Sequence, residues 1–376
     1  MSKRRILIIY STAGAGHRKA AFAIKKALDE TGPRASVDII DALDYTSAFF
    51  KWFYPRIYIF MVNRIPLFWG FGYYILDNKI FYSLVSWIRH LTNWFNARSL
   101  ARYLREMDYD VIITTHFLPT DIISMEGKKR IRSYLINVVT DYRMHTFWYA
   151  PATDMYVVAH DLAKDELMSK YGVGEDKIKV LGIPIDPLFS GHKDKEKLIK
   201  DLDLQKGLFT VLIGSGGFGV GPIADLVKSF KGIPIPVQLL VVCGKNDALR
   251  LSVKNMQDDV GVSIKAYGFI DNMDELMEVS DIIITKTGGM MSSEALSKDL
   301  PIIGVAPIPG QETRNFKILI KIGVVLDGRD VKEIPKMVTR LYNQKDSTEG
   351  LKEKIKAAKK PDAAHDIVRL AMDVLE

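Results

Sequence analysis

The chain has 376 residues, 48% of them hydrophobic, and carries a formal net charge of +7. This length is too great for one ordinary core and predicts two domains of about 150–200 residues each. The positive charge favours an anionic partner, such as nucleic acid, an acidic membrane leaflet or a phosphorylated ligand. The single cysteine, Cys243, excludes a disulfide framework and a zinc cluster within the chain, and we expect it as a small buried thiol in a strand.

The N-terminal sequence MSKRRILIIYSTAGAGH superficially resembles a secretory signal. Its apolar run, residues 6–10, is shorter than an h-region of about 7–15 residues, so it predicts a first strand instead. No later stretch approaches the ~20 uninterrupted apolar residues of a spanning helix. We therefore expect a soluble body in a reducing cytoplasm.

Short apolar runs alternate with helical patterns, which predicts parallel α/β architecture. The first series of strands is expected at residues 5–10, 37–41, 111–114, 134–139 and 155–158. Residues 180–187 contain two prolines and one glycine and favour an extended linker. The second series is expected at residues 208–214, 237–243, 263–266, 281–285, 301–305 and 324–326.

These series predict two Rossmann-like domains that face a central cleft, at residues 1–183 and 184–360. The charged tail is expected to be helical on both sides of Pro361. Its last part, residues 361–376, is then able to cross back onto the first domain.

Residues 45–95 break the α/β pattern, because they hold 18 of the 38 Phe, Trp and Tyr residues, with Asp77 as the only acid. Aromatic rings interleaved with basic residues favour the headgroup layer of a membrane. The alternative is a helical aromatic core or a dimer face. The residues expected at an anionic membrane surface are Trp52, Phe53, Arg56, Arg64, Trp69 and Trp87.

A glycine-containing loop, Ser-Thr-Ala-Gly-Ala-Gly-His at residues 11–17, follows the first strand and precedes the helical run 18–30. Its glycines allow a ligand to approach the backbone, and the helix N-terminus offers free amides. His17 is expected at the carboxyl edge of the sheet, where such folds bind ligands. An imidazole with a pKa near ~6.5 suits proton abstraction from an alcohol, whereas a capping or solvent-facing histidine is the alternative.

Two motifs of the second half suit a nucleotide-sugar ligand. The glycine run 214–221 follows a strand, so its amides can cradle a diphosphate, but it lacks the ending of a P-loop. Further on, Gly288 and Gly289 are expected to open a helix in which Glu294 accepts hydrogen bonds from a ribose diol. Gln311 and Glu312 are expected on a loop at the next strand's carboxyl edge, where they suit a hydroxyl-rich ligand.

The stretch 281–315, DIIITKTGGMMSSEALSKDLPIIGVAPIPGQETRN, resembles a known donor-binding signature. It is that of the family containing the peptidoglycan-precursor N-acetylglucosaminyltransferase, plant monogalactosyldiacylglycerol synthases and bacterial processive diacylglycerol glucosyltransferases. The resemblance covers nearly the whole chain, through the GAGH loop, the linker GIPIDP at 182–187, the glycine run and YGFIDNM at 267–273. VTDYRMHTFW at 139–148 resembles the galactolipid and glucolipid branch. The family implies a GT-B fold, with the acceptor bound by the N-terminal domain and the UDP-sugar by the C-terminal one.

The resemblance also implies roles for individual residues. His17 and Asp141 would be catalytic, while Gly14, Gly16 and His145 would bind the acceptor. Phe269 and Ile270 would lie beside the uracil, Glu294 would hold the ribose, and Gln311 and Glu312 would contact the sugar hydroxyls. The residues expected around the diphosphate are Gly214, Ser215, Gly216, Thr287, Gly288 and Gly289.

The function expected from these residues is inverting transfer of a hexose from a UDP-sugar to a lipid, with diacylglycerol favoured as the acceptor. An N-acetylglucosaminyltransferase acting on a polyprenyl-linked or other glycolipid intermediate stays open, as does a UDP-sugar epimerase of similar fold. Amides rather than a cation are expected to stabilise the leaving UDP, so no metal or cofactor is expected and the UDP-sugar is a substrate. The expected location is cytoplasmic, peripheral on the inner face of the plasma membrane, without nucleic acid as a partner.

Overall fold

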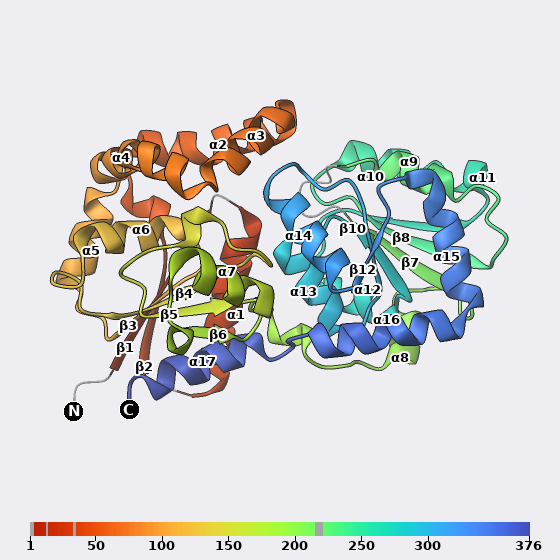
Figure 1. Cartoon of the computed structure of the whole chain (residues 1–376). Helices are drawn as coiled ribbons and strands as arrows, with labels where there is room; N and C mark the ends of the chain where they lie inside the picture. The colour runs from red at the N-terminus through yellow and green to blue at the C-terminus, as the bar shows by residue number, and fades with distance from the viewer. Residues whose placement is uncertain (1–3, 13, 33–34, 215–220) are drawn as a thin grey trace. The chain divides into compact units, whose positions relative to one another are not determined.

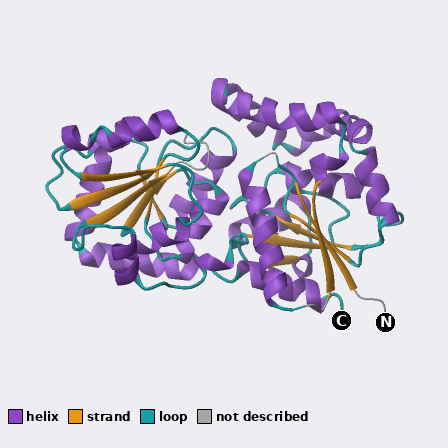
Figure 2. Ribbon diagram, turned by 180° about the vertical axis from the view of Figure 1, so that it is seen from behind, coloured by secondary structure: helices purple, strands orange, loops and turns teal. Residues whose placement is uncertain are grey.

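The computed structural model describes the chain except residues 1–3, 13, 33–34 and 215–220, and except the side chains of Asn63, Lys79 and residues 345–348. The described chain forms two compact units (Figure 1). The first unit comprises Met1–Pro187, Ile308–Arg314 and Asp362–Glu376, and the second comprises Leu188–Pro307 and Asn315–Pro361. Each unit has a parallel sheet with helices on both faces (Figure 2), which confirms the predicted α/β class.

The sheet of the first unit has the strand order β2-β1-β3-β4-β5-β6. Strand β1 pairs with β2 on one side and with β3 on the other, so the order of the strands reverses between β1 and β3. In open α/β sheets, ligands bind at such a reversal, beyond the carboxyl ends of the strands. The strands are β1 (Arg4–Tyr10), β2 (Ala35–Asp41), β3 (Val111–Thr114), β4 (Tyr134–Val138), β5 (Met155–Val158) and β6 (Ile178–Val180).

Helices cover both faces of this sheet. On one face, Ile24 of α1 and Ile367 of α17 are buried in the same apolar cluster as Ile8 of β1. On the other face, Leu100 of α5 and Ile122 of α6 are buried with strand residues of opposite orientation. The helices are α1 (Ala15–Glu30), α2 (Ala48–Arg64), α3 (Pro66–Leu76), α4 (Lys79–Asn96), α5 (Arg98–Glu106), α6 (Phe117–Glu126), α7 (Asp161–Tyr171) and α17 (Ala363–Asp373), with short 3-10 turns η1 (Ala42–Tyr45), η2 (Thr146–Trp148) and η3 (Glu175–Lys177).

The second unit repeats the plan, with the strand order β12-β11-β10-β7-β8-β9. Here the order reverses between β7 and β10, where Gly214 pairs with Thr285. The loops that follow β7 and β10 therefore lie next to each other at the carboxyl edge of the sheet. The strands are β7 (Phe209–Gly214), β8 (Val237–Val242), β9 (Ser263–Tyr267), β10 (Ile282–Thr285), β11 (Ile302–Gly304) and β12 (Val325–Asp327).

The core of the second unit lies between its sheet and the flanking helices. Cys243 follows β8 directly and is fully buried in this core. The helices are α8 (Lys195–Asp201), α9 (Ile223–Ser229), α10 (Asp247–Lys254), α11 (Gln257–Val260), α12 (Met273–Val279), α13 (Gly289–Ser297), α14 (Gln311–Lys321), α15 (Ile334–Asn343) and α16 (Lys345–Ala358), with η5 (Val331–Glu333), while η4 (Pro187–Phe189) lies where the two units meet along the chain.

Two local expectations are corrected by the structure. Residues 178–180 form the edge strand β6 next to β5, whereas the sequence predicted only a linker from residue 180 onward. The strand has three residues and an exposed Lys179, so it carries no alternating pattern. Gln311 and Glu312 lie in the first turn of α14 and not on a loop.

The aromatic segment forms three helices, α2, α3 and α4, whose large apolar side chains mostly point outward. Arg56 lies over the ring of Trp52 with 4.8 Å from Cζ to the ring centroid, and Arg64 is exposed. Trp69 differs, because it is half-buried and packs edge-on against Tyr58. We call the exposed set the aromatic surface: Phe49, Trp52, Phe53, Ile59, Phe60, Ile65, Leu67, Phe68, Phe71, Tyr74, Ile80, Phe81, Leu84, Val85, Trp87, Ile88, Leu91, Trp94 and Phe95.

Within the described part of the chain, no single helix is long and apolar enough to cross a membrane. The stretches Ala48–Val62 and Pro66–Leu76 meet that test only as a pair, and a bend of 109° separates them.

Candidate active site

His17 lies in the first turn of α1, at the strand reversal of the first unit. Gly14 is the N-cap of this helix and has extended backbone, and no side chain caps the helix. The first turn of α1 contains no acidic residue. Amides at the start of α1 are therefore not satisfied by a capping side chain and favour an electronegative ligand atom. Gly14 and Gly16 are both half-buried beside His17 in sequence.

Hydrogen bonds fix the ring of His17. Its Nδ1 lies 2.9 Å from the main-chain oxygen of Thr115, which directly follows β3. A carbonyl oxygen only accepts, so Nδ1 carries the proton and donates, and the neutral ring keeps its lone pair on Nε2. The hydroxyl of Thr140 lies 2.9 Å from the same Nδ1, and the Thr115 hydroxyl donates to the main-chain oxygen of His17 at 2.9 Å. The orientation and the tautomer of the ring are thus fixed by the protein.

The surroundings of His17 also set its protonation. Burial lowers the pKa of His17 below its ordinary value of 6.5, while the charge of Asp141 and the bond to Thr115 oppose this shift. His116 meets the His17 ring edge-on, with centroids 4.5 Å apart, and burial lowers the pKa of His116 well below 6.5. Both rings are therefore neutral at pH 7, as a general base requires.

Asp141 is 3% exposed and accepts hydrogen bonds from two directions. One carboxylate oxygen accepts from the indole Nε1 of Trp148 at 3.2 Å, and the other accepts from the amide of Gln311 at 2.5 Å. The structure thereby brings a residue expected to be catalytic together with one expected to contact the donor sugar. Their separation of 170 residues in sequence explains why no local pattern indicated the contact.

The turn that carries Gln311 belongs to the first unit by its contacts, although α14 continues into the second. Glu312 closes this turn, because its carboxylate accepts from the main-chain N–H of Ile308 at 2.8 Å. Gln311, which is bonded to Asp141, thus lies on the segment that the sequence assigned to the donor.

His145 has different contacts from those expected of an acceptor-binding residue. Its Nε2 lies 2.9 Å from the main-chain oxygen of Tyr73, and its Nδ1 accepts from the N–H of Phe147 at 3.1 Å. The side chain is 1% exposed, and burial lowers its pKa to about 4. With both ring nitrogens bonded inside the protein, His145 holds the end of α3 to η2.

Several residues expected to bind the donor lie at the strand reversal of the second unit. Gly288 is the N-cap of α13, whose first turn has no acid and no capping side chain. Glu294 is 2% exposed within this helix, and Thr287 is buried just before it. These positions confirm that a glycine-opened helix contains Glu294.

Further residues expected to bind the donor lie at the end of β7, at the same reversal, and after the edge strand β9. Gly214 ends β7, while Phe269, 60% exposed, and the half-buried Ile270 follow β9. Ser215 and Gly216 lie outside the described residues.

Two Asp-x-Asp triplets occur, at residues 108–110 and 201–203. Asp110 accepts from the main-chain N–H of Arg5 at 2.8 Å, and Asp203 pairs with Lys265 at 2.8 Å. Over the ranges described above, no three His, Cys, Asp or Glu side chains gather in a metal-binding group.

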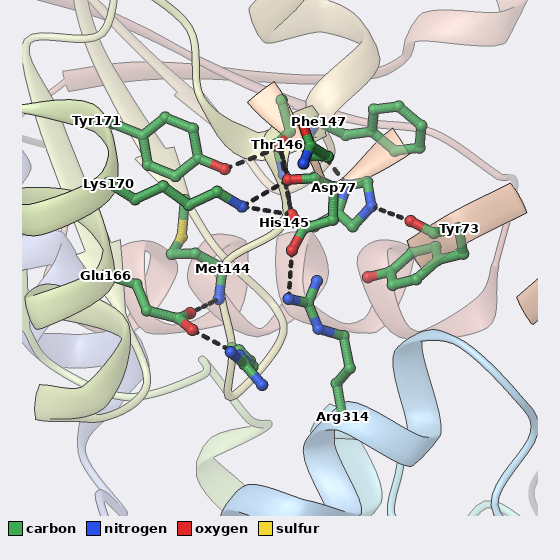
Figure 3. Close-up of polar contacts among 12 residues, drawn as sticks. Tyr73, Asp77, Met144, His145, Thr146, Phe147, Glu166, Lys170, Tyr171 and Arg314 are labelled. Atoms are coloured by element: carbon green, nitrogen blue, oxygen red, sulfur yellow. Dashed lines mark hydrogen bonds and ion pairs between the residues drawn. The ribbon is translucent and has the colours of Figure 1, made fainter. Parts of the chain in front are cut away.

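A buried polar cluster that sequence analysis did not identify surrounds Asp77, the C-cap residue of α3 (Figure 3). Its carboxylate pairs with Arg314 of α14 and with Lys170, 3.0 Å away, and accepts from the N–H of Thr146 at 3.0 Å. Burial alone would raise the pKa of Asp77, but Arg314, His145 and Lys170 hold it below its ordinary value of 3.8. The only sequence signal was that Asp77 is the lone acid among residues 45–95.

Two parallel sheets, each with a glycine-opened helix at its strand reversal, have the architecture of the GT-B fold, and the comparisons below identify a UDP-sugar glycosyltransferase. The family model for monogalactosyldiacylglycerol (MGDG) synthase matches residues 17–185, and the glycosyltransferase family 28 C-terminal domain matches residues 210–367. The chain belongs to the family of the MGDG synthases and processive diacylglycerol β-glucosyltransferases.

Relatives with the name processive diacylglycerol β-glucosyltransferase match along almost the whole chain. That of Bacillus cereus strain G9842 is 30% identical over 369 residues, which is 97% of this chain and 92% of the relative. That of Bacillus cytotoxicus is 29% identical over 377 residues, which is 98% of this chain and 93% of the relative.

Solved structures share the fold at low sequence identity. MurG of Acinetobacter baumannii has a TM-score of 0.65 and 13% identity, covering 98% of this chain and 99% of MurG. The UDP-GlcNAc 2-epimerase of Neisseria meningitidis has a TM-score of 0.60 and 13% identity, covering 98% and 100%. The fold alone therefore does not separate transfer from epimerisation.

Proposed function

We propose that this chain transfers a hexose from a UDP-sugar to the free hydroxyl of diacylglycerol, with inversion at the anomeric carbon. The observation that carries the proposal is the arrangement of His17, Asp141 and Gln311. A half-buried imidazole with its lone pair on Nε2 is close enough to Asp141 to feel its charge, and the Asp141 carboxylate is bonded to the expected sugar-binding side chain. The names of the curated relatives support diacylglycerol as the acceptor.

The reaction is a single displacement. The acceptor oxygen forms a bond to the anomeric carbon while the bond from that carbon to the UDP oxygen breaks. Nε2 of His17 takes the acceptor's proton, and the negative charge of Asp141 stabilises the imidazolium that forms. The leaving UDP carries the electron pair away, and amides at the N-terminus of α13 stabilise its charge.

The acceptor is delivered from a lipid surface. Diacylglycerol stays in the bilayer, so the enzyme must bind at the surface of the bilayer to reach it. The aromatic surface suits an anionic headgroup layer, because its rings are apolar and basic side chains lie over them. Arg56 is stacked on Trp52, and Cζ of Arg98 lies 3.8 Å from the centroid of the Trp94 ring. We place the protein as a peripheral enzyme on the cytoplasmic face of the plasma membrane.

The test is an assay of the purified protein with UDP-glucose, UDP-galactose or UDP-N-acetylglucosamine, against vesicles with and without diacylglycerol. We expect UDP release only when diacylglycerol is present, and a hexosyl-diacylglycerol by mass spectrometry with inverted anomeric configuration by NMR. Conversion of the UDP-sugar to another UDP-sugar without lipid would instead identify an epimerase. Transfer only to a polyprenyl-linked acceptor would also overturn the proposal.

A further inference from the structure

One face of α3 is packed against the turn at the start of α14. Gly70, Tyr73 and Asp77 are spaced by three and four residues, so they lie on one side of the helix. A Cβ on Gly70 would lie 2.6 Å from Cβ of Pro309, so only glycine fits there. Gly310 has a φ of +102°, and a Cβ there would lie 3.2 Å from the Tyr73 ring. The segment Ile308–Arg314 is therefore in close contact with α3.

An ion pair ends this contact. Arg314 is 5% exposed and bonds the Asp77 carboxylate through Nη2, as Figure 3 shows. Its Nε and Nη1 have no hydrogen-bond partner among the described residues, so Asp77 is its main polar anchor. Asp77 is held independently by Lys170 and by Thr146. The position of Asp77 in the first unit therefore does not depend on Arg314 alone.

The same turn of α14 carries Gln311, three residues before Arg314 and on the same helix face. Gln311 bonds Asp141, and Arg314 bonds Asp77, so two side chains of one turn are attached to two different parts of the first unit. We propose that the Asp77–Arg314 ion pair is a positioning device, which sets Gln311 beside Asp141. Both members are positioning residues, and the inference rests on the proposed function.

The test compares the affinities of UDP and of the UDP-sugar, measured by calorimetry, so it needs no turnover. Arg314→Gln removes the ion pair and leaves Asp77 with Lys170 and Thr146, so the variant is expected to fold with an unchanged circular dichroism spectrum. Its Kd for UDP should stay within about twofold, because the uridine and diphosphate contacts lie elsewhere. Its Kd for the UDP-sugar should rise about tenfold, the loss of roughly one charged hydrogen bond.

Two further variants complete the design. Arg314→Lys keeps the charge without the planar fork, and should fall between the wild type and Arg314→Gln. Arg329→Gln breaks an exposed arginine ion pair with Asp327 and should change neither affinity. If the ratio of the two Kd values in Arg314→Gln equals that of the wild type, whether both affinities are unchanged or both fall equally, the inference is overturned. A wild type that binds the UDP-sugar but transfers nothing to lipid would overturn the proposed function alone.

Discussion

Nδ1 of His17 lies 2.9 Å from the main-chain oxygen of Thr115, and this distance assigns the tautomer of the ring. The proton stays on the buried nitrogen, and the lone pair stays on Nε2. In the proposed mechanism, Nε2 therefore accepts the proton without a rearrangement of the ring.

Replacing His17 with alanine removes the proposed base. We expect kcat for lipid glycosylation to fall by about 10²–10⁴-fold, the range for loss of a general base, with little change in the affinity for UDP. His192→Ala, at an exposed histidine of the second unit, is the matched control. Equal kcat values for wild type and His17→Ala would remove His17 from the role of base.

The dependence of the rate on pH should report the pKa of His17. Burial lowers that pKa below 6.5, and a base works only when deprotonated. The value of kcat/KM should therefore be independent of pH near pH 7 and should fall only below pH 6.5. A pH series in buffers of constant ionic strength measures the acid limb, and a limb centred above 7 would contradict the lowered pKa.

Asp141→Asn should shift this acid limb to still lower pH. The negative charge of Asp141 raises the pKa of His17, so its removal lets burial lower that pKa further. The loss of charge should also reduce kcat by about tenfold or more, since the imidazolium is no longer stabilised. The same pH series applied to the variant checks both effects. A shift of the acid limb to higher pH would show that the charge of Asp141 does not raise the pKa of His17.

His145 should make the folded protein sensitive to acid. Its pKa is about 4 in the folded protein and 6.5 when unperturbed, so the unfolded chain binds the proton more readily between these values. The free energy of unfolding should fall as pH falls from 6.5 to 4, by roughly 3 kcal/mol from this group. Urea unfolding of wild type and His145→Asn at several pH values measures the difference, and parallel pH profiles would show that His145 does not contribute.

The aromatic surface should control binding to vesicles. Trp87 of α4 is 61% exposed, so Trp87→Ser should leave folding intact and weaken partitioning to anionic vesicles by about tenfold. Leu251→Ser, at an exposed apolar residue of α10, is the control and should bind like the wild type. Sedimentation with vesicles measures both, and equal loss in the two variants would mean that the surface is not specific.

Periodicity was sufficient to predict eleven of the observed strands, because buried parallel strands read as short apolar runs. The edge strand β6 was not found, since it has three residues with Lys179 exposed between them. The first turn of α14 was taken for a loop because Pro307, Pro309 and Gly310 precede it closely.

The site was predictable where residues are neighbours in sequence and strand ends. His17 and Gln311 lie in the first turns of helices, and Glu294 lies in a helix that follows β10, so their place at a sheet edge could be inferred. The Asp77–Arg314 pair could not, since 237 residues separate its members and each residue alone is an ordinary charge. The bond of Nδ1 to Thr115 was equally hidden, because it depends on the register that places β3 beside β1.

The last helix, α17, packs with α1 in the first unit (Figure 1). Its residues Ala364, Ile367 and Val368 are buried in the apolar cluster that also contains residues of α1 and β1. During synthesis, one apolar face of the first unit's sheet and of α1, the helix with His17, therefore stays partly uncovered until residues 363–375 have left the ribosome. The second unit can close on itself before the first is complete. Nascent chains halted near residue 360 should accordingly depend on chaperones for their N-terminal half. Removal of residues 362–376 should lower the activity that we attribute to His17, although none of these residues is part of the candidate site.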